Sequence, residues 1–209
     1  MEETVQPKRH RKIVWIVMVA IFSALSTVLY FLKFPLPFLF PGFLKIQFSN
    51  LPIIMVGFLL GPWAGIATLT VKSLIALPFS NSMYVGEFAD FILGLGVSLS
   101  SSLIYKFNHT KKGAIIGLVV SLFVWIILGV LANWLILIPF YIELYFKGDV
   151  AGLVAALAII KNINEDNYML YYLLFAVVPF NALISVLVNL VTYFTYKKLS
   201  NFLHAKIEF

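Results

Sequence analysis

The 209-residue chain contains no cysteine, and only 11% of its residues are charged. The missing cysteine excludes disulfide bonds, thiolate metal ligands and cysteine nucleophiles. The sequence also lacks a GxxxxGK[ST] phosphate loop, an HExxH zinc motif and a GxSxG nucleophile elbow. We therefore expect a protein that is not an enzyme and holds no metal. If its activity consumes ATP, another polypeptide must hydrolyse it.

Hydrophobic residues make up 62% of the sequence, and the mean hydropathy is +0.99. This composition lies far outside that of soluble domains and predicts an all-α integral membrane protein. A helix needs about 20 apolar residues to cross the hydrocarbon, so the chain has room for about six crossings in a single membrane domain, residues 1–209. No internal repeat is visible, which disfavours a complete secondary transporter built from inverted repeats.

Apolar runs separated by turn and charge signals divide the chain into six predicted transmembrane helices. A short surface helix, 150–160, is expected inside a polar loop at 141–167, and Pro179 is expected to kink the last helix. The six predicted helices are 13–32, 47–60, 63–77, 86–105, 113–140 and 168–196.

The lysines and arginines predict the orientation of these helices. A cytoplasmic N-terminus places ten of the fifteen in the cytoplasm and four outside, with Lys72 inside a helix. This distribution satisfies the positive-inside rule. We therefore predict that the basic segments 1–12 and 197–209 are cytoplasmic, and that the loops 33–46 and 141–167 face outside.

The segment 34–52 combines many prolines with many apolar residues. It holds four of the nine prolines of the chain and five phenylalanines. The prolines prevent a continuous helix. Irregular backbone beside hydrocarbon is tolerated where protein or a cavity satisfies its polar groups. We therefore predict that 33–46 forms an apolar extracellular lid over a pocket, with Phe38, Phe40 and Leu44 near the ligand. The alternative is an amphipathic hairpin that rests on the membrane surface.

Three ionisable residues fall inside predicted helices, namely Lys72, Glu87 and Asp90. Ionisable groups at membrane depth are costly and usually functional, so we expect them at a ligand site in the outer half of the protein. The alternatives are that the two carboxylates complement a helix dipole, and that Lys72 pairs with one of them or snorkels to the interface.

Two asparagines, Asn133 and Asn181, lie in otherwise apolar runs. An amide offers two donors and an acceptor, and inside a membrane these need partners. We predict that both amides bind ligand. The alternative is hydrogen bonding between helices, which we assign to Asn189.

Aromatic residues near these polar groups could form the walls of a pocket for a planar ligand. The candidates are Tyr84, Trp134 and Phe180. The alternative is a belt of aromatic residues at the membrane interface.

Ala20 and Ala24 form a small-residue face on the first helix. Such a face lets a second helix approach closely, so it is a candidate docking surface for a partner protein. The alternative is packing within the chain.

Motifs from residue 13 to residue 199 carry a resemblance to a known family. They include AIFSA, LKIQFSNLP, GFLLGPWAG, VGEFADF, LANWLILIP and VPFN. Together they resemble the substrate-binding S components of energy-coupling factor (ECF) vitamin transporters, and among these the riboflavin-specific members. The resemblance implies a six-helix fold in a bacterial cell membrane, with riboflavin bound as transported substrate rather than as cofactor. It also implies a transmembrane coupling subunit and two ATPase subunits as partners.

Individual residues follow from this resemblance. The family asparagines that contact flavin match Asn133 and Asn181, and the alanines that dock on the coupling subunit match Ala20 and Ala24. Lys72 matches a lysine of the third helix.

The sequence departs from the riboflavin-specific pattern at several positions, and the family's GELAN segment reads GEFAD at residues 86–90. Ile184 stands where these members commonly have a lysine, and Gln47 and Asn50 replace two carboxylates of an LKIDFSD segment. Two alternatives therefore stay open: an S component for another vitamin or precursor, such as FMN, pyridoxine or a pyrimidine, and a stand-alone small-molecule carrier.

Overall fold

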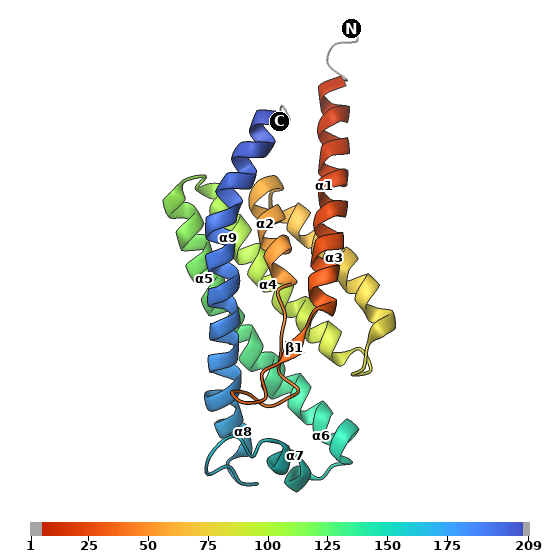
Figure 1. The fold of residues 1–209 in the computed structure, drawn as a ribbon, viewed down its shortest axis with the longest axis vertical. Coiled ribbons are helices and arrows are strands. Elements are labelled where there is room, and N and C mark those ends of the chain that lie inside the picture. The colour runs from red at the N-terminus through yellow and green to blue at the C-terminus, as the bar shows by residue number, and fades with distance from the viewer. Residues whose placement is uncertain (1–5, 207–209) are drawn as a thin grey trace.

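The computed structural model describes residues 6–206, which fold mostly into helices (Figure 1). The first helix, α1 (Gln6–Phe31), begins seven residues before the apolar run that predicted it. The intervening lysines and arginines are good helix formers. The basic segment therefore extends the helix, at least from residue 6, instead of forming a separate tail.

Five stretches of the described residues are long and apolar enough to cross a membrane. The next apolar helix, α2 (Asn50–Leu60), has 11 residues and rises about 16 Å, roughly half of the hydrocarbon thickness. We predicted six membrane-spanning helices. Among the described residues five stretches are long enough to span, and the sixth helix, α2, is shorter. The five are Arg11–Phe31, Pro62–Phe79, Val85–Phe107, Lys111–Phe146 and Tyr168–Tyr196.

A one-residue break separates α2 from α3 (Pro62–Ala76). Gly61 has φ of 90°, which glycine adopts without steric cost, and Pro62 occupies the first turn of α3, where its missing N–H is not needed. The short helix η1 (Leu77–Phe79) and then α4 (Val85–Phe107) follow.

The fifth predicted helix runs further than predicted and contains a widened turn. It comprises α5 (Lys111–Ala132), the π-helical turn η2 (Asn133–Leu137) and α6 (Ile138–Phe146). The N–H of Ile138 donates to the carbonyl of Asn133, five residues back. Pro139 follows directly, and a π-bulge relieves the clash between a proline ring and the preceding turn.

The last predicted helix also contains a π-helical turn before a proline. It comprises α8 (Tyr168–Tyr172), the π-helical turn η3 (Leu173–Val177) and α9 (Val178–Lys206). The N–H of Val178 donates to the carbonyl of Leu173, directly before Pro179. The predicted distortion at this proline therefore takes the form of a π-bulge. Because α9 continues to Lys206, most of the predicted tail 197–209 is helical.

The predicted irregular loop after α1 is a small β-hairpin. Strands β1 (Phe34–Pro35) and β2 (Lys45–Ile46) pair antiparallel, with Phe34 opposite Ile46. Phe40, Leu44 and Ile46 are buried, so the hairpin packs on the bundle. In the later loop, α7 (Val150–Ala156) ends four residues before the predicted boundary.

The bundle has two distinct ends (Figure 1). The start of α1, the α2–α3 turn, the α4–α5 turn and the end of α9 lie at one end, which we call the basic end. The hairpin, α6, α7 and α8 lie towards the opposite end, which we call the hairpin end. The start of α1 and the end of α9 therefore lie on the same side of the bundle, as the predicted orientation requires.

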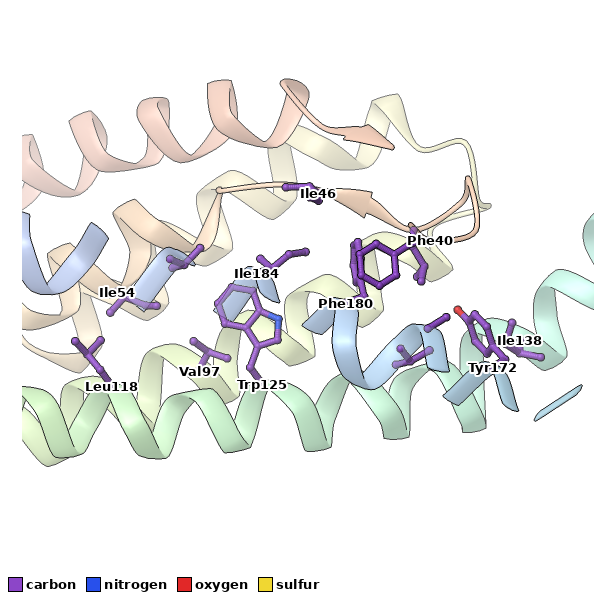
Figure 2. Packing of buried hydrophobic residues seen from close by; sticks show 14 of the residues in the cluster. Phe40, Ile46, Ile54, Val97, Leu118, Trp125, Ile138, Tyr172, Phe180 and Ile184 are labelled. Atoms are coloured by element: carbon purple, nitrogen blue, oxygen red, sulfur yellow. The ribbon is translucent and has the colours of Figure 1, made fainter. Parts of the chain in front are cut away.

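The largest hydrophobic core joins the hairpin, α5 and α9 (Figure 2). Trp125 of α5 lies beside Ile184 of α9, and Phe40 of the hairpin lies beside Phe180. A second, smaller cluster packs α1 against α2 and α3 and includes Phe22. The hairpin is therefore held by the same core that joins the two long helices.

Candidate ligand-binding cavity

An inner cavity of about 160 Å³ lies between the hairpin, α4, α5 and α9. Its wall is mostly apolar, with several amides, one carboxylate and the lysine Lys45. The lining includes Leu44, Gln47, Asn50, Ala89, Asp90, Leu93, Trp125, Gly129, Asn133, Phe180, Asn181 and Ile184.

A larger, more polar cavity of about 400 Å³ lies nearer the hairpin end, and we call it the outer cavity. The two cavities share Phe43, Lys45, Gln47, Gly86 and Asp90, so they adjoin. Their combined size suits a small-molecule ligand, since such sites usually measure about 300–1,000 Å³. The outer lining also includes Tyr30, Lys33, Ser82, Glu87, Tyr141 and Tyr145.

Asn133 begins the π-bulge of the fifth span and is buried in the inner cavity wall. Its Nδ2 donates to the carbonyl of Gly129 at 2.8 Å, and the hydroxyl of Tyr172 donates to its Oδ1 at 2.7 Å. Tyr172 lies on α8, so the predicted alternative of interhelical bonding holds for this oxygen. It also fixes how the amide faces the cavity. Tyr172 could not be predicted from the sequence, because it belongs to an aromatic-rich run.

Asn181 is buried on α9 and faces the same cavity. Its Nδ2 donates to the carbonyl of Val177 in its own helix at 2.8 Å. A Cβ atom at position 129 would lie 2.6–2.7 Å from the Asn181 amide, which is too close. Gly129 therefore leaves the space that this amide occupies. No hydrogen bond to the Asn181 Oδ1 comes from the described residues, which leaves this oxygen available for a ligand.

Asn189 has the role that the sequence predicted. Its Nδ2 donates to the carbonyl of Leu118 on α5 at 2.9 Å. This bond joins α9 to α5 outside the two cavities, so interhelical bonding is confirmed for this residue.

The buried lysine is paired within the protein. Lys72 is fully buried and forms a salt bridge with Asp90. Gln47 donates its Nε2 to the second carboxylate oxygen at 2.5 Å. The predicted alternative of an internal pair is therefore confirmed. Lys72 contributes to the lining of neither cavity, whereas Asp90 contributes to both.

Glu87 is buried in the first turn of α4. Its carboxylate accepts hydrogen bonds from the hydroxyls of Tyr30 at 3.1 Å, Ser80 at 2.5 Å and Ser82 at 3.1 Å. Three hydroxyl donors satisfy much of the carboxylate's accepting capacity. Its position also complements the helix dipole. These donors could not be predicted from the sequence, since they lie on α1 and on the α3–α4 loop.

Two lysines flank the outer cavity. The ammonium of Lys33 lies 4.1 Å from the centre of the Tyr30 ring. Partial burial lowers the pKa of Lys33, and the nearby Glu87 carboxylate opposes this shift. Lys45 on β2 is exposed and belongs to both linings.

The predicted aromatic wall is only partly in place. Phe180 lines the inner cavity, and the buried Phe40 packs edge to face on it with ring centres 5.2 Å apart (Figure 2). Phe38, Tyr84 and Trp134 are 72%, 59% and 51% exposed and lie outside both linings. Successive helical residues point about 100° apart, so Trp134 faces away where Asn133 faces inward.

Two buried amide oxygens follow the hairpin without a partner among the described residues. They are Oε1 of Gln47 and Oδ1 of Asn50, and both side chains line the inner cavity. A buried acceptor without a donor costs free energy. These positions therefore have hydrogen-bonding capacity that the described residues do not use.

The small-residue face of α1 points away from the bundle. Ala20 and Ala24 are exposed, whereas Phe22, Ser23 and Ser26 are buried. Ala20 and Ala24 therefore do not pack against another helix of the described chain.

Comparison with known proteins gives a consistent result. A family model described as "ECF transporter, substrate-specific component" matches residues 15–196. The riboflavin transporter RibU of Staphylococcus aureus (strain TCH60) is 31% identical over 188 residues, covering 90% of this chain and 91% of the relative. The riboflavin transporter FmnP of Bacillus subtilis (strain 168) is 33% identical over 133 residues, covering 62% and 70%. A solved S component of a bacterial ECF transporter superposes with a TM-score of 0.69 at 31% identity, covering 92% of this chain and 98% of that one.

Proposed function

This chain belongs to the substrate-specific components of ECF transporters, and from that premise we propose that it is the riboflavin-binding subunit of an ATP-driven uptake system. Several relatives are named riboflavin transporters. One observation of this chain carries the proposal: Asn133 and Asn181 lie together in the inner cavity beside Trp125 and Phe180. In this role riboflavin is transported substrate and not a cofactor.

The cavity suggests how the flavin is held. Trp125, Phe180 and Ile184 form apolar walls that suit a planar ring, and the amides of Asn133 and Asn181 suit the polar edge of that ring. The hydroxylated side chain of riboflavin then extends into the more polar outer cavity, towards Glu87. The hairpin covers the site from the hairpin end.

Because Ile184 departs from the riboflavin-specific pattern, riboflavin must be tested against other candidate ligands. Ile184 is 3% exposed in the inner cavity wall, where riboflavin-specific members commonly have a lysine. Lys72 does not replace that lysine here, because it is paired with Asp90 outside the linings. The site therefore recognises the ring through amides and apolar contacts, and the lysine that lines the inner cavity is the exposed Lys45 of β2 instead of a residue on α9.

A titration of detergent-purified protein tests the ligand. We expect an absorption spectrum with flavin bands and saturable quenching of riboflavin fluorescence at sub-micromolar concentration. Competition by FMN, pyridoxine or a pyrimidine is measured in the same assay. A colourless protein that does not quench, but binds one of these competitors, would assign that competitor in place of riboflavin.

The partner proposal concerns α1. The basic end is cytoplasmic, and Ala20 and Ala24 dock on a transmembrane coupling subunit that acts with two ATPase subunits. We expect Ala24→Trp to abolish uptake and to leave riboflavin binding unchanged, because the bulky ring blocks helix approach on an exposed face. Ile127→Trp, on the exposed face of α5, is the matched control and should affect neither. Loss of binding in Ala24→Trp would contradict the docking role. Uptake into vesicles that lack ATPase subunits would favour a stand-alone carrier.

A further inference from the structure

A separate cavity of about 430 Å³ lies at the basic end, away from the inner and outer cavities. It is bounded by the start of α1, the α2–α3 turn and the end of α4. Three basic side chains line it, Arg11, Lys106 and His109, and no carboxylate of the described residues does. It is therefore a positively charged pocket between helices.

Among the described residues, no carboxylate lies in this lining to neutralise Arg11 and Lys106. The six acidic residues between positions 4 and 207 all lie in the first turns of α4, in α6 or in the loops of the hairpin end. The remaining three, Glu2, Glu3 and Glu208, lie outside the described residues. The described residues therefore supply no counter-charge for the pocket.

Aromatic residues place this pocket at the level of lipid headgroups. Trp15, Trp63 and Tyr105 belong to its lining, and Trp63 is 73% exposed. Tryptophan and tyrosine are enriched at this depth, because their rings meet hydrocarbon while their polar tips meet water. Leu59 and Leu60 continue the lining on the apolar side, where an acyl chain would lie.

The chemistry of the basic groups points to phosphate. A guanidinium binds two phosphate oxygens at once, and an ammonium adds a point charge. The first turn of α3 adjoins the pocket and has neither an acidic residue nor a side-chain cap, so it adds positive potential. Basic pockets between helices at a cytoplasmic surface are known to hold anionic headgroups.

We propose that this cavity binds the phosphate headgroup of an anionic phospholipid, such as phosphatidylglycerol, from the membrane leaflet at the basic end. The apolar and aromatic side of the lining favours a lipid over free phosphate. The site is independent of riboflavin, so its test and the riboflavin titration can fail separately.

The experiment uses the full chain in phosphatidylcholine bilayers with increasing amounts of brominated phosphatidylglycerol. Quenching of tryptophan fluorescence is measured in a Trp134→Phe background, so that Trp15 and Trp63 dominate the accessible signal. We expect phosphatidylglycerol to be preferred over phosphatidylcholine by about fivefold, the effect of roughly one well-placed basic group. Arg11→Gln with Lys106→Gln should reduce this preference to near one.

The matched control is Lys111→Gln with Lys112→Gln, which removes the same charge from the same end outside the cavity lining. It should retain most of the preference. Melting temperatures of both double variants, compared with that of the unmodified chain, show that they are folded. An equal loss in both would indicate diffuse attraction to the membrane surface and would overturn the proposal.

Two further outcomes would also overturn it. Abolition of the preference by inorganic phosphate, at an ionic strength matched with chloride, would assign the pocket to a free anion. No preference for phosphatidylglycerol in the unmodified chain would leave the pocket to another occupant, such as an acidic segment of a partner protein.

Discussion

The charged groups and the neutral amides at the hairpin end are treated differently by the fold. Lys72, Asp90 and Glu87 each have partners inside the chain. Asn181, by contrast, uses its Nδ2 within its own helix and has no described donor for its Oδ1. A buried charge must be compensated before any ligand arrives, because leaving it unpaired costs far more than leaving an amide half satisfied. We therefore propose that the charged residues stabilise the site and that the amides bind the ligand.

The strongest way to break this comparison is Lys72→Met. It leaves Asp90 without its cation beside a fully buried position. Removing one partner of a buried pair typically costs about 3–5 kcal/mol of unfolding free energy. We expect a large fall in the melting temperature of the detergent-solubilised protein, measured without ligand.

The control is the double variant Lys72→Met with Asp90→Asn, which removes both charges and keeps an acceptor for Gln47. It should recover much of the lost stability. If the double variant is as unstable as the single one, the ion pair is not the reason for the loss.

The second prediction concerns two asparagines of α9, one expected to affect ligand affinity and the other expected to affect stability. Asn181→Leu should weaken riboflavin binding by about 1–3 kcal/mol, the cost of an unpaired polar group at the ligand. Its melting temperature without ligand should change little, because its only described side-chain bond is to Val177, one turn earlier in the same span. Binding is measured by fluorescence quenching and stability by thermal unfolding.

Asn189→Leu is the matched control on the same helix. It removes the bond to Leu118 of α5 and should lower stability without changing affinity. Unchanged affinity in Asn181→Leu would remove Asn181 from the ligand site.

The smallest expected effect comes from Tyr172→Phe. It removes the hydroxyl that donates to Oδ1 of Asn133 at 2.7 Å, a neutral bond worth about 0.5–1.5 kcal/mol of stability. Riboflavin can then supply the missing donor, so affinity should change less than stability does. A loss of affinity larger than that of Asn181→Leu would mean that orientation by Tyr172 matters more than the amides themselves.

The sequence predicted much of this architecture through physical signals that act locally. Apolar run lengths predicted the long helices, and proline content predicted the interruption after α1 and the distortion at Pro179. The charge pattern predicted both chain ends on one side. The length of α2 and the pairing of β1 with β2 were not predictable in this way, since both depend on packing against elements far away in the chain.

Four polar residues of the cavity walls were predicted from the sequence, but the residues that donate hydrogen bonds to them were not. Asn133, Asn181, Glu87 and Asp90 could be found because polar groups at membrane depth are rare. Trp134 was misplaced because a run of apolar residues does not show which face is buried. The donors to Glu87 and Asn133 come from other helices, and no local pattern identifies them.

The two π-bulges make the orientation of the hairpin end sensitive to single-residue insertions and deletions. Each bulge adds about one residue to a turn, which rotates everything beyond it by about 100° relative to an unbroken helix. Deleting one residue within Asn133–Leu137 would keep the helix continuous while turning Tyr141 and Tyr145 away from the outer cavity that they line. Evolution could therefore alter what the cavity presents to a ligand by changing helix register alone, without replacing any side chain that lines it.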